Sequence, residues 1–332
     1  MNFTVYRDPY QNCFQLVLSA LLRREDIETE KLWYQIGLFY HENKDTFEIK
    51  SYYYDLNDFL KRNIDVNIKY IAPDLSSDAR LEETIDNSLK KSKTIGISTD
   101  IYELLYCSYS QRYHTTHYIE VLDKQDDKYL VADHYYNYFD WVNKEIIFSG
   151  IKSYVDNNLD EEAQIFYIEL GDEYSDDFDL LVSSLNNNYL SMHSNSDIYK
   201  NITNNFENTW TGLEAVSKIA KKLESIFLLE NGERDNLLSK IYPYFKDIGN
   251  SRYQYYCFLK HNELSDLGEE IRVSGQNWNT ITNMITRANI KNEYTEMIKR
   301  INEKFNAILL QEERITRILE KKLSKKESTC VK

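Results

Sequence analysis

The sequence predicts an α+β fold in which a mixed first half is followed by an all-helical second half. Alternating apolar runs, typical of strands, occur between residues 47 and 170 and fade beyond about residue 172. From there apolar residues recur at helical spacing, and Pro243 is the only proline. A chain of 332 residues is longer than one compact core usually needs, so we expect two domains, residues 1–172 and 173–332.

The expected elements follow from the spacing of apolar residues. In the first half, a helix opens at Cys13 and further helices are predicted at 30–40, 56–62 and 81–89. Strands are predicted at 47–52, 66–71, 94–98, 118–122, 129–133 and 165–170. The second half predicts helices at 176–190, 210–230, 234–241, 251–271, 278–289 and 292–324. Pro243 should end the third of these, because proline cannot donate the hydrogen bond that continues a helix.

Cys13 occupies the expected first position of an apolar helix. Asn12 is a good N-cap, and Gln15 can reach back to it in a capping box. The start of a helix carries unpaired N–H groups and the positive end of the dipole, so this position favours a thiolate. A lone cysteine is more often a small buried hydrophobe. A functional role for Cys13 therefore depends on finding a partner for it.

A histidine hairpin supplies that partner. The apolar runs 118–122 and 129–133, with a polar turn between them, predict two antiparallel strands. With the turn centred near residues 125 and 126, His117 faces the neighbourhood of Asp133 across the ladder. Asp133 could hold one ring N–H of His117 while the other ring nitrogen takes the thiol proton. This Cys, His, Asp order is typical of enzymes with a cysteine nucleophile.

Other combinations of the same residue types are weaker. His114, His117, Asp133 and His134 could be assembled into a zinc or iron site. However, neighbouring strand residues point to opposite faces, so Asp133 and His134 cannot easily bind one ion. We therefore predict no metal site. Cys107 lacks a helix start and is expected to be structural.

These features together resemble one family. The early cysteine that opens a helix, the segment 94–106 and the histidine hairpin ending at Asp133 are similar to the N-terminal domain of the butirosin biosynthesis protein H group. The resemblance implies a papain-like cysteine-protease fold related to bacteriocin-processing peptidases. The second half, with residues 252–259 and Trp278, is similar to the helical domain that follows in such proteins. Within that half, Arg252 could pair with Glu263.

The resemblance also implies acyl transfer. In this reading Cys13, His117 and Asp133 form a catalytic triad, and an acyl group passes from a carrier-protein thioester through acyl-Cys13 to a small amine in antibiotic or nonribosomal peptide assembly. No bound cofactor is implied, because the donor arrives on the phosphopantetheine of an acyl- or peptidyl-carrier protein. Papain-like peptidases usually have a glutamine shortly before the cysteine as an oxyanion donor, but Arg7 stands at that position. Gln11 is the nearest substitute.

Composition limits the remaining function classes. A net charge of −14 disfavours a general nucleic-acid binder, which needs a basic surface. The N-terminus has no signal-like pattern and no run approaches the length of a membrane span, so we expect a cytoplasmic protein without a membrane partner. Four cysteines without paired spacing argue against a disulfide framework. Two alternatives stay open: a cysteine peptidase or amidase with the same triad, and a catalytically silent binding module.

Overall fold

The chain divides into two compact units. The computed structural model describes residues 4–43, 46–159, 162–172, 180–193, 197–201 and 208–330. One unit consists of residues 1–29 and 57–178, and the other of residues 30–56 and 179–332. Residues 30–56, which the sequence analysis placed in the first domain, thus pack with the helical half. The domain boundary at 172 stays a prediction, and residues 173–179 lie outside the described part of the chain.

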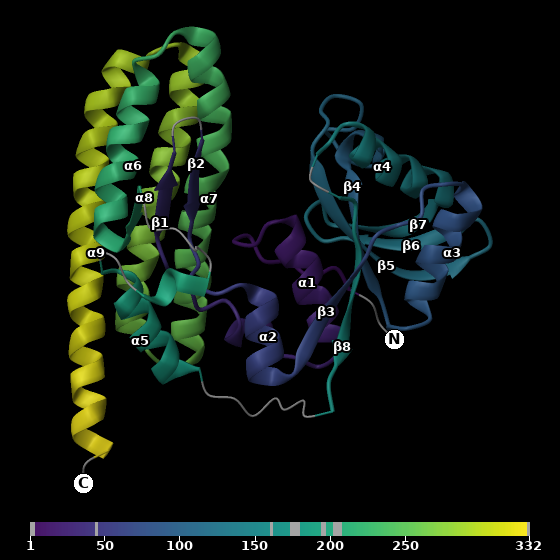
Figure 1. The fold of residues 1–332 in the computed structure, drawn as a ribbon, viewed down its shortest axis with the longest axis horizontal. Helices are drawn as coiled ribbons and strands as arrows, with labels where there is room; N and C mark the ends of the chain where they lie inside the picture. Colours follow the sequence, from purple (N-terminus) through teal and green to yellow (C-terminus); the bar gives the residue numbers. More distant parts are fainter. Residues whose placement is uncertain are drawn as a thin grey trace. The chain divides into compact units, whose positions relative to one another are not determined.

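The first unit is built on an antiparallel sheet. In the described residues this sheet has six strands in the order β3–β8–β4–β5–β6–β7 (Figure 1). The strands are β3 (Val66–Ile71), β4 (Ile95–Asp100), β5 (Thr116–Gln125), β6 (Lys128–Asp133), β7 (Tyr138–Asn143) and β8 (Ile165–Leu170). The sequence analysis missed β7, because half of its residues are exposed and the strand shows no apolar alternation. A mixed unit with antiparallel sheet agrees with the expected α+β class.

Helices pack on both faces of this sheet. Helix α1 (Cys13–Arg24) contacts β4, β5 and β8, and its Phe14 ring meets Tyr118 edge-on. Helices α3 (Asp78–Leu89) and α4 (Lys144–Asp156) share a core with Ile119 and Val121. Since successive strand residues point to opposite faces, β5 joins α1 on one side and α3 with α4 on the other. Helix α2 (Leu56–Ile64) and the 3₁₀ turn η2 (Ile101–Glu103) complete this unit, and the 3₁₀ turn η1 (Thr29–Lys31) spans the point in the chain where the second unit begins.

The second unit combines long helices with a small sheet. Its helices are α5 (Leu181–Ser191), α6 (Gly212–Phe227), α7 (Asn231–His261), α8 (Ser265–Lys291) and α9 (Tyr294–Cys330), with the 3₁₀ turn η3 (Asp197–Asn201). In the described residues the sheet has three strands, β2 (Phe47–Lys50), β1 (Phe39–Glu42) and β9 (Thr209–Thr211), and it packs on α6 and α7. The helical C-terminal region is confirmed. The expectation that this part is all-helical was wrong, because residues 209–211 pair with β1.

The helix expected at residues 30–40 was also wrong. Residues 32–38 form no regular element, and the segment ends in strand β1. Its N–H groups find side-chain acceptors, since Ile36 donates to Asn188 and Leu38 donates to the Tyr199 hydroxyl. Both residues are fully buried. In this buried segment Leu32, Ile36 and Phe39 are four and three positions apart, which is also the spacing of residues on one face of a helix. This coincidence explains the wrong prediction.

Pro243 does not end a helix. Helix α7 continues through it from Asn231 to His261. Proline removes one backbone hydrogen bond and crowds the preceding turn, at a cost of about 3 kcal/mol. Ile241 and Phe245 on either side are fully buried in the core of the second unit. Burial of two such side chains contributes about 1.5–3 kcal/mol each, which is enough to offset the cost of the proline.

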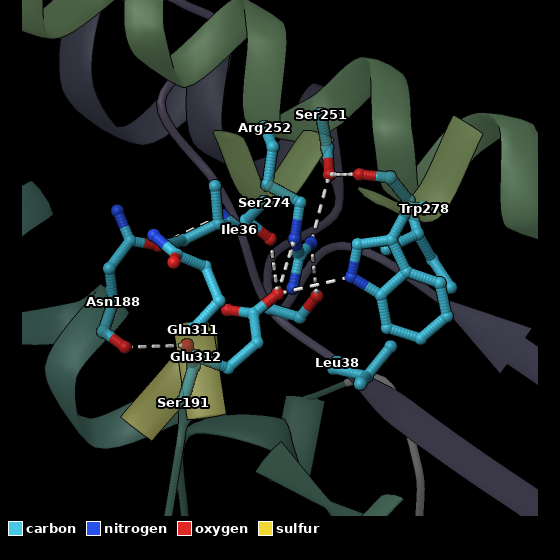
Figure 2. Close-up of polar contacts among 12 residues, drawn as sticks. Ile36, Leu38, Asn188, Ser191, Ser251, Arg252, Ser274, Trp278, Gln311 and Glu312 are labelled. Carbon is cyan, nitrogen blue, oxygen red and sulfur yellow. Dashed lines mark hydrogen bonds and ion pairs between the residues drawn. The ribbon is translucent and has the colours of Figure 1, made fainter. Parts of the chain in front are cut away.

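A buried ion pair joins three helices of the second unit (Figure 2). Arg252 on α7 donates from Nε to Glu312 Oε1 on α9 over 3.0 Å, and neither side chain is exposed. The same oxygen accepts from the Ser274 hydroxyl at 2.7 Å and from the Trp278 indole at 3.1 Å, both on α8. The expected pairing of Arg252 with Glu263 was wrong. Arg252 pairs with Glu312 instead, and Glu263 follows the end of α7 in a left-handed turn conformation.

Candidate active site

Cys13 is the first residue of α1, as the sequence predicted. The Asn12 carboxamide accepts from the Gln15 N–H at 2.9 Å, and the Gln15 carboxamide accepts from the Asn12 N–H at 3.1 Å. This capping box fixes the start of the helix. The first turn has no acidic side chain to offset the positive end of the dipole. Cys13 is partly exposed as a residue and lies at a position that favours negative charge.

His117 and Asp133 form a buried pair. His117 Nε2 lies 2.8 Å from Asp133 Oδ2, and the two side chains are 3% and 0% exposed. The side chain of Cys13 lies close enough to His117 to help raise the pKa of the imidazole. Because Nε2 is used by Asp133, the other ring nitrogen is the one that remains for the thiol. The structure therefore brings the three residues predicted from the sequence into one connected set.

The hairpin register differs slightly from the predicted one. Gln125 pairs with Lys128, so the turn is centred one residue later than expected. An irregularity between Val121 and Asp123 shifts the ladder again towards the start of β5. Side chains on neighbouring strands reach diagonal as well as direct partners. His117 and Asp133 meet despite these shifts for that reason.

Asp133 is held by donors on both carboxylate oxygens. Oδ1 accepts the backbone N–H groups of Tyr135 and Tyr136, each at 3.1 Å. Oδ2 accepts the Tyr106 hydroxyl at 3.1 Å in addition to the His117 ring. The carboxylate therefore has a fixed orientation. The sequence analysis missed Tyr106, and its position in a segment rich in tyrosine gave no signal.

The charge on His117 follows from its partners. Burial alone lowers the pKa of His117, but the charge and hydrogen bond of Asp133, together with the bond to Cys13, outweigh burial and raise the pKa to about 10. His117 is thus protonated at neutral pH. An imidazolium beside a cysteine at a helix start is the arrangement that stabilises a thiolate.

Gln11 is buried and its carboxamide is fully bonded. Its Oε1 accepts from the Ser19 hydroxyl at 2.8 Å. Its Nε2 lies 3.3 Å from the Tyr6 hydroxyl and 3.2 Å from Asp8 Oδ2. Both amide hydrogens therefore have partners. Gln11 can donate to an oxyanion only by exchanging one of these two long hydrogen bonds.

The remaining histidines of the hairpin have separate partners. His114 Nδ1 lies 2.6 Å from Asp100 Oδ2, and its ring stacks on Tyr102 with centroids 4.1 Å apart. His134 Nε2 lies 3.0 Å from Glu120 Oε2. The candidate metal ligands thus point to different carboxylates. Within the described residues, no three His, Cys, Asp or Glu side chains are grouped in a way that could hold a metal ion.

Aromatic rings surround His117. The centroids of Tyr135 and Tyr136 lie 6.0 Å and 5.3 Å from that of the His117 ring. Tyr135 is 47% exposed, so this ring lies partly at the surface. The expected structural role of Cys107 agrees with its burial and with the hydrogen bond that its sulfur accepts from the Tyr109 N–H at 3.3 Å. With 28 tyrosines in the chain, composition alone could not single out these rings.

One comparison with known proteins relates part of the chain to a family. Residues 12–134 match the family described as butirosin biosynthesis protein H, N-terminal. The matched segment begins at the N-cap of α1 and ends directly after Asp133, so it contains all three residues of the connected set. The resemblance seen in the sequence is confirmed over this segment. No curated protein gave a significant match to the chain. None of the helices in the described part combines the length and hydropathy that a membrane crossing requires.

Proposed function

We propose that this protein is a cysteine acyltransferase that forms amides in natural-product biosynthesis, with a papain-like catalytic half. The acyl group would come from a carrier-protein thioester and pass through acyl-Cys13 to an amine. The observation that carries the proposal is the contact of Cys13, at the start of α1, with a His117 that is paired with Asp133. The family match over residues 12–134 supports the reaction class.

In the first half-reaction the Cys13 thiolate attacks the thioester carbonyl of the donor. A carbon–sulfur bond to Cys13 forms while the bond to the carrier sulfur breaks, and His117 gives its proton to the departing carrier thiolate. The backbone N–H of Cys13 can donate to the oxyanion, and Gln11 can do so after exchanging a partner. Each such donor is commonly worth about 3 kcal/mol.

In the second half-reaction an amine attacks acyl-Cys13. The now neutral His117 takes a proton from the attacking nitrogen, the carbon–nitrogen bond forms, and the Cys13 sulfur leaves as a thiolate. The original imidazolium–thiolate pair is thereby restored. Throughout both steps Asp133 holds the His117 ring in one orientation, because Tyr106, Tyr135 and Tyr136 donate hydrogen bonds to its oxygens.

The test follows the mass of the acyl-enzyme. A carrier protein loaded with an acyl thioester is mixed with wild type, Cys13→Ala and Cys257→Ala, with and without amines. We expect an adduct on Cys13 that amines discharge faster than water. Cys257 is also partly exposed but lies in the helical unit, so Cys257→Ala should form the adduct normally. Absence of any adduct on Cys13 would rule out the nucleophile, and rapid hydrolysis without an amine effect would favour a peptidase or amidase.

A further inference from the structure

We infer that His134 is a positioning residue that, held by Glu120, fixes the segment preceding Cys13 against the sheet. The inference rests on the proposed function, since it concerns how Cys13 and Gln11 are held for acyl transfer. Neither His134 nor Glu120 belongs to the catalytic set described above. Their hydrogen bonds nevertheless connect the end of β6 to the start of the chain.

The two ring nitrogens of His134 have different roles. Nδ1 accepts the Tyr6 N–H at 2.9 Å, and a backbone N–H can only donate, so Nδ1 carries no proton. The ring proton of the neutral imidazole is therefore on Nε2, which donates to Glu120 Oε2 at 3.0 Å. The side chain is completely buried. Both nitrogens are thus used in one defined tautomer.

Glu120 is a buried carboxylate with donors on both oxygens. Arg24, the last residue of α1, contacts Oε1 at 3.2 Å and Oε2 at 3.1 Å. The Thr94 hydroxyl, next to the start of β4, donates to Oε1 at 2.7 Å. Burial raises the pKa of Glu120, but the bonds from His134 and Arg24 outweigh it, and the pKa is lowered. A charge buried at this depth needs full pairing, so the cluster has one favoured geometry.

Tyr6 connects this cluster to the active site. Its backbone N–H is bonded to His134, and its hydroxyl lies 3.3 Å from Gln11 Nε2. Gln11 precedes the N-cap of the helix that begins with Cys13. His134 also directly follows Asp133 in the chain. One short stretch therefore holds both the carboxylate that orients His117 and the segment that leads to the nucleophile.

Two substitutions of His134 separate positioning from general stabilisation. In His134→Asn the carboxamide oxygen can take the place of Nδ1 and still accept the Tyr6 N–H, but nothing replaces Nε2. In His134→Gln the carboxamide can take the place of Nε2 and still donate to Glu120, but the Tyr6 N–H loses its acceptor. Each variant loses one of the two hydrogen bonds of the ring, so their effects on thermal stability should be similar.

The measurements are the rate of Cys13 alkylation by iodoacetamide and the hydrogen exchange of the Tyr6 amide. At about pH 6, well below the pKa of about 8.5 of an ordinary thiol, alkylation reports the activated Cys13. We expect His134→Gln to slow alkylation by about tenfold and to speed hydrogen exchange of the Tyr6 amide. His134→Asn should stay closer to wild type in both the alkylation rate and the exchange rate. Equal losses in the two variants, or losses that follow the melting temperature alone, would overturn the inference.

A matched pair of carboxylate variants provides the control. Glu82 accepts from Lys124 at 2.6 Å and from Lys144 at 3.1 Å in the same unit. Glu82→Gln should leave Cys13 alkylation unchanged, and Glu120→Gln should slow it. If both His134 variants fail to fold, NMR of the imidazole nitrogens in wild type decides the matter. A His134 ring that is charged or protonated on Nδ1 would contradict the inference.

Failure of this inference can be told apart from failure of the proposed function. A wild-type Cys13 that alkylates no faster than Cys257 would refute the nucleophile, and Tyr6 exchange in the His134 variants would still decide whether His134 anchors the segment. Conversely, an activated Cys13 with Tyr6 exchange unchanged in His134→Gln would overturn the positioning role alone.

Discussion

Asp133→Asn should leave the fold intact and deprive His117 of its function as a base. Asp133 Oδ1 accepts two backbone N–H groups, from Tyr135 and Tyr136. The carboxamide oxygen of the variant must take that place, which puts its NH₂ group where Oδ2 contacts His117 Nε2 at 2.8 Å. Nε2 would then have to accept a hydrogen bond, and the ring proton would move to the nitrogen that faces Cys13.

The size of the effect follows from this change of tautomer. A base that carries its proton on the side of the nucleophile cannot accept another there, and the same substitution in the Ser-His-Asp template lowers kcat by about 10⁴-fold. That corresponds to about 5.5 kcal/mol of transition-state stabilisation. The charge of Asp133 also raises the pKa of His117, so the variant loses the imidazolium at neutral pH. The cost in folding free energy should be only about 1 kcal/mol, because the Tyr106 hydroxyl can rotate to accept a hydrogen bond.

The assay compares acyl transfer and Cys13 alkylation in wild type, Asp133→Asn and Asp100→Asn. Asp100 is a matched control, since it pairs with His114 at 2.6 Å and also accepts backbone N–H groups. Because a His117 imidazolium favours the thiolate, wild type should still alkylate at about pH 6, well below the pKa of about 8.5 of an ordinary thiol. Asp133→Asn should lose alkylation at low pH, and Asp100→Asn should not. Equal activity of Asp133→Asn and wild type, or equal losses in the two variants, would refute the reasoning.

Three further predictions concern the nucleophile and the buried charges. Cys13→Ala and His117→Ala should each abolish acyl transfer, and the double variant should be no worse, because the two residues act as a unit. Arg252→Leu should lower the free energy of unfolding in urea by about 3–5 kcal/mol by leaving Glu312 buried without its cation, and adding Glu312→Leu should restore much of it. The lowered pKa of Glu120 means that its contribution to stability is present above the ordinary pKa of 4.5 and is lost as pH falls through the folded-state value. Glu120→Gln should therefore make the melting temperature less dependent on pH in the acid range. An unchanged pH dependence would contradict this prediction.

The geometry around Cys13 could be predicted because it is encoded locally. The capping residues Asn12 and Gln15 lie three positions apart, and their reciprocal bonds place the cysteine at the helix start. His117 and Asp133 are 16 residues apart in one hairpin, so the turn brings them together. A turn shifted by one residue did not separate them, because strand side chains reach diagonal neighbours.

The supporting residues could not be predicted, because their partners are distant in sequence. Arg24 and Glu120 are 96 positions apart, and Tyr6 and His134 are 128 apart. No periodicity or spacing rule links such pairs. The same limit explains the strand pairing of the second unit. His41 contacts Thr209 from 168 positions away, and in the described part of the chain residues 209–211 are a strand through their pairing with β1.

The neighbours Asp133 and His134 at the end of β6 explain why His117 is charged and His134 is neutral. Asp133 is bonded by two backbone N–H groups and a hydroxyl, none of which carries charge, so His117 supplies the positive charge that this carboxylate needs. Glu120 already has the Arg24 guanidinium, so His134 can remain neutral and use its second nitrogen for structure. A one-residue slip of β6 would exchange the faces of Asp133 and His134 and break both pairs. The pairing of β5 with β6 therefore sets the charge at the nucleophile as well as its position.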